Sequence, residues 1–172
     1  MTRPSAIAAY LAFCRWLDRI TLAISIGAGL FLTGAGLAIV VMRYGFGVGR
    51  VELQDAAAYA FAVLLAFSLP VTLARDGHVR VEVISERLPA LYLRVADILA
   101  FALFLIPVFA LILWAGWADL SYAWAIREGA IETGGLGGLY LVKTALPVAA
   151  VLMILQGLAR LLAPRTDRAG DA

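Results

Sequence analysis

The residues best suited to chemistry stand in one polar stretch, residues 75–94, which reads RDGHVRVEVISERLPALYLR. Asp76 and Arg80 are four residues apart, and so are His78 and Glu82. On a helix each pair would share a face, where an ion pair or a hydrogen bond could support the turn. We interpret His78 as a partner-contact or loop-ordering residue; a solvated loop residue and a pH-sensitive switch are the alternatives.

The sequence lacks the ligands that a metal or a haem would need. It holds one histidine, His78, and one cysteine, Cys14, which excludes a paired-histidine haem site and makes a zinc site of His and Cys ligands implausible. The glycines of residues 43–55 resemble a phosphate-binding loop only superficially, because the P-loop lysine is missing. We therefore expect no cofactor, no metal and no catalytic residue, and we interpret Cys14 as a small apolar residue of the interface.

Composition indicates that these polar residues are positioned by a membrane protein. The chain has 172 residues and is 63% hydrophobic, whereas soluble domains are about 45–50% apolar. Long runs are free of charge, and lipid requires every backbone group to be satisfied inside a helix. The sequence predicts an all-α membrane protein, one membrane domain over residues 1–172, with spans at residues 20–42, 56–74, 98–118 and 139–159.

Two segments outside the spans are predicted to lie at the membrane surface. Residues 1–19 carry apolar side chains at helical spacing and read as an amphipathic N-terminal segment. Residues 75–94 read as an interfacial segment between the second and third spans, with a short helix ending near Pro89. The glycine-rich stretch before the fourth span, residues 119–138, is predicted to be mobile and exposed.

Small residues and prolines mark the spans themselves. The four glycines of the first span favour close approach of another helix; they are Gly27, Gly29, Gly34 and Gly36. The other spans each hold a proline that removes a helix hydrogen bond; these are Pro70, Pro107 and Pro147. No charged residue stands in the middle of a span, where ion-coupled carriers usually hold polar groups.

The distribution of basic residues predicts the orientation. Ten of the fourteen Lys and Arg residues fall in the N-terminal arm, residues 75–94 and the C-terminal tail. The positive-inside rule places these three segments, and both termini, in the cytoplasm. The basic residues form no single patch, so the sequence does not indicate nucleic-acid binding.

Several short motifs follow one another in an order typical of a known family. They are Arg43-Tyr44 after the first span, Glu52-Leu53 before the second, Gly77-His78-Val79 and Glu82 after it, then Leu88-Pro89, and Pro147 in the last span. With this order and the four-span layout, the chain resembles the DctQ-type small membrane subunit of tripartite ATP-independent periplasmic (TRAP) transporters. It departs from the family at Val51, where a tryptophan is common, and at Glu82, where aspartate is common.

The resemblance implies an accessory part of an ion-gradient-driven carrier of organic acids in the bacterial cytoplasmic (inner) membrane. Its partners would be a large many-span permease subunit, whose scaffold it braces, and a periplasmic solute-binding protein. Candidate partner-contact or loop-ordering residues are Arg43, Glu52, Gly77, His78, Glu82 and Pro89. Arg43 and Glu52 would pair across the first loop, or each would meet headgroups and water.

Two other functions remain open at this point. A small homo-oligomeric channel or carrier would need a pore between copies, which hydroxyl or backbone groups can line. A membrane-embedded enzyme would need polar residues converging at one membrane face, and only residues 75–94 offer such a group.

Overall fold

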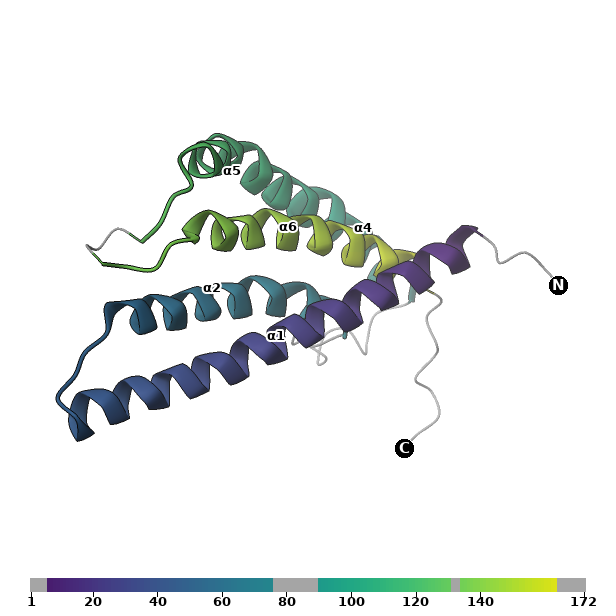
Figure 1. Ribbon diagram of the computed structural model, residues 1–172. Coiled ribbons are helices and arrows are strands. Elements are labelled where there is room, and N and C mark those ends of the chain that lie inside the picture. The colour runs from purple at the N-terminus through teal and green to yellow at the C-terminus, as the bar shows by residue number, and fades with distance from the viewer. Residues whose placement is uncertain (1–5, 76–89, 131–133, 164–172) are drawn as a thin grey trace, which may run out of the picture.

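The computed structural model describes residues 6–75, 90–130 and 134–163, and the regular elements among these residues are all helices (Figure 1). The helices are α1 (Ala6–Gly45), α2 (Val51–Ala74), α4 (Ala90–Ala100), α5 (Ile106–Ile126) and α6 (Leu139–Leu162). A single π-helical turn, η1 (Phe101–Leu105), joins α4 to α5 in one rod. Four helices are long and apolar enough to cross a membrane: α1, α2, the α4–η1–α5 rod and α6. The predicted all-α membrane fold with four spans is confirmed.

The helices lie in a row rather than in a closed four-helix bundle. α1 packs on α2, α2 packs on α6, and α6 packs on α5, while α2 and α5 barely touch each other in the described part of the chain (Figure 1). α6 is therefore the inner helix. In its most apolar 18-residue stretch, 44% of the residues are buried, whereas in the corresponding stretch of the α4–η1–α5 rod 0% are buried. α1 and α5 form the two edges of the row.

The interface between α2 and α6 is built from small side chains. Ala66 of α2 meets Ala145 and Ala149 of α6, with Val63 and Phe67 packed around them. In lipid no hydrophobic effect drives two helices together, so association depends on close van der Waals contact, which alanine and glycine permit. The alanines of α6 thus explain why this helix holds the centre of the row.

The first helix is one uninterrupted element. It runs for 40 residues, about 60 Å at 1.5 Å per residue, which is roughly twice the thickness of a bilayer core. Residues 6–19 are helical, as predicted, but they continue the first span without a break and are not a separate segment. Within this part of α1, Cys14 is buried where the helix contacts α6.

The third rod changes its helical winding just before a proline. Pro107 lacks the N–H that an α-helix would use and its ring crowds the carbonyl four residues earlier. The turn before it widens, and the Ile106 N–H bonds to the Phe101 carbonyl, five residues back. Pro70 and Pro147 instead stand inside helices that continue through them.

Candidate functional site

A polar cluster joins α1 to α6 at the end of the row where α1 begins and α6 ends (Figure 1). The Tyr10 hydroxyl donates to the Leu155 carbonyl at 2.8 Å. In return, Gln156 Nε2 donates to the Cys14 carbonyl at 2.9 Å. Gln156 is buried, so its bond is made away from water, where an unpaired amide would be costly. The apolar stripe of residues 6–19 therefore serves, at least at Tyr10 and Cys14, to pack on another helix.

The same end of the row also ties α2 to both of its neighbours. Arg75, directly after α2, forms a bidentate ion pair with Asp18 of α1. Its Nη2 donates to Oδ2 at 3.1 Å and its Nε donates to Oδ1 at 3.4 Å. Arg160 of α6 donates through Nη1 to the Leu73 carbonyl at 2.9 Å. A cation at the last carbonyls of a helix also meets the negative end of its dipole. Three helices are thus fixed to one another at this end.

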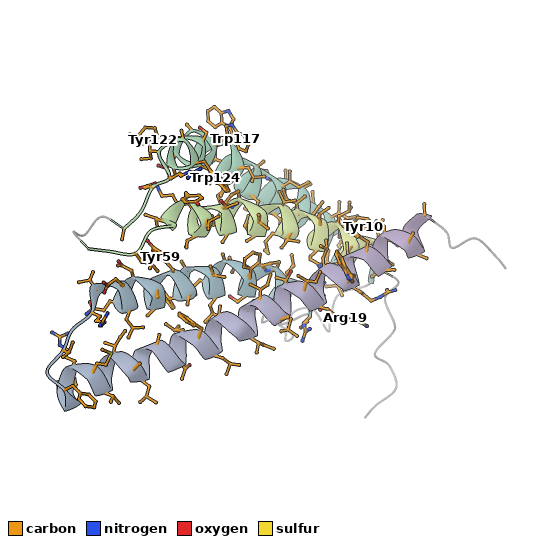
Figure 2. All side chains as sticks on the ribbon, in the orientation of Figure 1. Tyr10, Arg19, Tyr59, Trp117, Tyr122 and Trp124 are labelled. Carbon is orange, nitrogen blue, oxygen red and sulfur yellow. The ribbon has the colours of Figure 1, made fainter. Side chains whose placement is uncertain are left out.

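At the opposite end, α2 holds the loop that precedes α6. The Leu136 N–H donates to Asp55 Oδ2 at 2.9 Å, and the Tyr59 hydroxyl donates to the Leu136 carbonyl at 2.9 Å. Tyr59 points from α2 toward this loop in Figure 2. Two side chains of α2 thus bind both peptide groups of Leu136. Residues 119–126 belong to α5, and the mobility of the loop that follows stays a prediction.

A charged trio links α5, the following loop and α6. Lys143 Nζ lies 3.0 Å from Asp119 Oδ2 and 2.7 Å from Glu128 Oε2. Glu128 Oε2 is buried and receives no well-directed hydrogen bond in the described part of the chain, so its contact with Lys143 is an ion pair. Two carboxylates face one ammonium, which leaves the trio with a formal charge of minus one.

Aromatic side chains gather at the same end of α5, where Figure 2 labels Trp117, Tyr122 and Trp124. Trp124 Nε1 donates to Thr144 Oγ1 at 2.9 Å, and its ring meets Tyr140 edge to face at a centroid distance of 4.8 Å. Trp117 and Tyr122 are exposed. Such residues prefer the level of the lipid headgroups, which fits an interfacial anchor at this end.

The hydroxyl groups inside the spans are used by their own helices. Ser25 donates to the Thr21 carbonyl and Thr33 to the Gly29 carbonyl, both at 2.9 Å. Ser68 and Thr72 of α2 do the same one turn back along their helix. These hydroxyl protons are therefore not presented to a solute, which argues against a polar path through the described helices.

Two of the predicted site residues lie in the described part of the chain, and they are exposed. Arg43 stands near the end of α1 and Glu52 in the first turn of α2. No ion pair joins them among the described residues, so their pairing stays a prediction. Gly77, His78, Glu82 and Pro89 lie outside the described residues.

The row leaves two apolar surfaces without a neighbour in the described chain. We call the first the outer face of α1; it consists of Leu30, Gly34 and Leu37. Leu30 is 70% exposed and Leu37 is 66% exposed, and a Cβ at Gly34 would meet nothing within 4 Å. The second is a groove of about 620 Å³, the α2–α5 groove, floored by α6 and walled by α2 and α5.

Sequence patterns did not single out the residues that join the helices. Gln156, Asp18 and Arg160 bond across helices that are distant in sequence, mostly to main-chain carbonyls. A main-chain acceptor leaves no signal in the sequence. The one available signal was Gln156, an amide within an apolar span, since buried polar groups in lipid require a partner.

A family model matches most of the chain. The model is described as tripartite ATP-independent periplasmic transporters, DctQ component, and it matches residues 32–166. The match begins inside α1 and ends just beyond α6. None of the curated proteins compared with the chain matches it.

Proposed function

The chain belongs to the DctQ family, a component of tripartite ATP-independent periplasmic transporters, and from this premise we propose that it is the small accessory subunit that braces the scaffold of a large permease. It is a multi-pass membrane protein with four spans. In this proposal it has no catalytic residue and carries no solute itself, and the large subunit moves the solute.

The open row of helices carries this proposal. A protein that moves a solute alone needs polar groups around a path near the membrane midplane. Here the polar contacts cluster at the two ends of the row, and the hydroxyls between them bond within their own helices. A Cβ at Gly34, on the outer face of α1, would meet nothing within 4 Å in the described chain, and a glycine allows a foreign helix to come close. This combination suits a rigid brace that offers an edge to a larger protein.

The polar clusters would give the brace its stiffness. A moving transport domain needs a fixed reference in the membrane, and side-chain bonds at both ends of the row oppose sliding of one helix along another. The exposed aromatic residues Trp117 and Tyr122 would hold the row at a fixed depth in the bilayer.

The finer properties of the complex follow from the family and from charge. An ATP-independent transporter that concentrates its cargo must draw on an ion gradient, and the resemblance points to organic acids as cargo. A periplasmic system belongs in the bacterial cytoplasmic (inner) membrane, with a periplasmic solute-binding protein as the third partner. The excess of basic residues in the arm, residues 75–94 and the tail supports an orientation with both termini in the cytoplasm.

A pull-down of the tagged chain from its native membrane in nanodiscs, with mass spectrometry of the partners, tests the proposal. We expect a large many-span protein at about one copy per chain. Recovery of the chain alone as a defined oligomer would contradict the proposal and favour a homo-oligomeric channel or carrier.

A further inference from the structure

The α2–α5 groove is lined by apolar side chains, and its charged lining residues lie toward one end. It forms because α2 and α5 both pack on α6 without packing on each other. Its walls are almost wholly apolar and include Ala62, Leu69 and Ile112. Asp119 and Lys143 are its charged lining residues, and both stand toward the same end, where α5 ends and α6 begins.

The length of the groove matches one leaflet of a bilayer. On α5 it runs from Ile112 to Leu120 and on α6 from Leu139 to Pro147, about 12 Å on each helix at the helical rise. Half of a bilayer core is about 15 Å. The charged end therefore falls near the headgroups, and the apolar remainder follows the acyl chains of one leaflet. The volume of about 620 Å³ lies within the usual range of small-molecule sites.

The charges at the Asp119 end of the groove favour one kind of lipid headgroup. Lys143 is held between Asp119 and Glu128, so its ammonium already has two carboxylate partners. The Asp119 side chain is 67% exposed, whereas that of Lys143 is 29% exposed, so the carboxylate is the more available partner. Glu128 and its neighbour Arg127 do not line the groove, so the charges that face it are those of Asp119 and Lys143.

We propose that the α2–α5 groove binds a phospholipid with a primary-amine headgroup, whose ammonium pairs with Asp119 while one acyl chain fills the groove. The ammonium donates hydrogen bonds to the carboxylate, which strengthens the contact beyond simple attraction. An anionic headgroup without an amine would bring its negative charge to the exposed Asp119 carboxylate, with no ammonium to pair with it.

This site is a property of the chain itself and does not depend on the proposed function. A lipid held in the groove would complete the surface that α2 and α5 leave open. It would also fill, with a defined molecule, space that the row of helices cannot fill with its own side chains.

Native mass spectrometry of the purified full-length chain, titrated with lipid after delipidation, tests the proposal. The probes are palmitoyl-oleoyl phosphatidylethanolamine and palmitoyl-oleoyl phosphatidylglycerol, which share their acyl chains. We expect the ethanolamine lipid to bind about three- to fivefold more tightly, as a partly exposed ion pair permits. Asp119→Asn is expected to abolish this preference while leaving acyl-chain binding in place.

A second variant tests the apolar part of the groove rather than its charged end. A Cβ at Gly116 would meet nothing within 4 Å, and Gly116 lines the groove, so Gly116→Leu fills it without a clash at its Cβ. Displacing two methylenes of the acyl chain should weaken binding of both lipids about tenfold. Gly34→Leu, on the outer face of α1, adds the same side chain elsewhere and should leave lipid binding unchanged.

Three results would overturn the proposal. Equal affinity for the two lipids, unaffected by Asp119→Asn, would remove the role of the amine. Unchanged lipid binding in Gly116→Leu, with its thermal unfolding also unchanged, would place the lipid elsewhere. Loss of the large subunit from Gly116→Leu pull-downs, with no lipid retained by the original chain, would show that a partner helix covers the groove.

Discussion

The Phe101 ring occupies the space in which a side chain at position 157 would have to lie. A Cβ built on Gly157 comes within 2.7 Å of Phe101 Cε2 and within 3.2 Å of Leu105 Cδ1. Phe101 begins the π-helical turn and Gly157 lies on the buried side of α6. The third rod can therefore cross α6 closely only where α6 has no side chain.

Gly157→Ala is expected to destabilise the chain by about 1–3 kcal/mol, because the added methyl group overpacks a tight contact. Thermal unfolding in detergent measures the loss. Gly34→Ala is the matched control, since its Cβ meets nothing within 4 Å. Phe101→Leu combined with Gly157→Ala should recover part of the loss. An unchanged melting temperature in Gly157→Ala would mean that the third rod does not pack there.

Gln156→Leu is expected to destabilise the chain by about 0.5–1.5 kcal/mol, because the bond from Nε2 to the Cys14 carbonyl is lost while the volume is nearly kept. Resistance to chemical denaturation measures the effect. Gln54→Leu provides a control, since Gln54 is exposed near the start of α2. Equal effects of the two variants would remove Gln156 from the contact between α1 and α6.

Composition was sufficient to predict the membrane helices, because long apolar runs have one stable form in lipid. Gly157 shows why packing could not be predicted in the same way. Glycines at 27, 29, 34 and 36 were singled out as a packing face, yet among the described residues only a Cβ at Gly29 would lie within 4 Å of another helix, at Leu64. The role of a glycine depends on which helix packs against it. The spacing of apolar residues predicts each helix but not the order of the helices in the row.

The polar contacts were even less accessible to sequence reasoning. Asp55 and Tyr59 hold a loop more than seventy residues away through its main chain. Any residue at position 136 except proline offers the same N–H and carbonyl, so the side-chain type at that position does not signal the contact. The family motifs, by contrast, were read from order along the chain, and the matched model over residues 32–166 confirms the family.

Asp55→Ala is expected to free the loop before α6. The Leu136 N–H loses the acceptor Asp55 Oδ2, and about 1–2 kcal/mol of lost protection should speed its hydrogen exchange roughly tenfold. Glu52→Ala, one turn earlier and exposed, should leave this exchange unchanged. Slow exchange at Leu136 in both variants would show that Asp55 does not anchor the loop.

His78→Ala and Glu82→Ala are expected to reduce solute uptake by the assembled transporter without preventing membrane insertion. These residues lie outside the described part of the chain, and the expectation rests on their place in the family motif. Uptake of labelled solute into cells, together with quantification of the chain in the membrane fraction, measures both effects. Arg87→Ala, in the same stretch but outside the motif, is the control. Full uptake in both motif variants would remove residues 75–94 from the functional account.

Gly34→Leu is expected to reduce recovery of the large subunit about tenfold, because a bulky side chain on the outer face of α1 holds a partner helix away. The isolated chain should keep its melting temperature, since the added side chain begins in open space. Gly116→Leu is the matched control at the opposite edge of the row and should leave assembly intact. Since the two variants make the same change on different edges, the comparison identifies the edge that meets the permease. Normal recovery in Gly34→Leu would move the contact away from the outer face of α1, and loss in Gly116→Leu alone would place it on the groove.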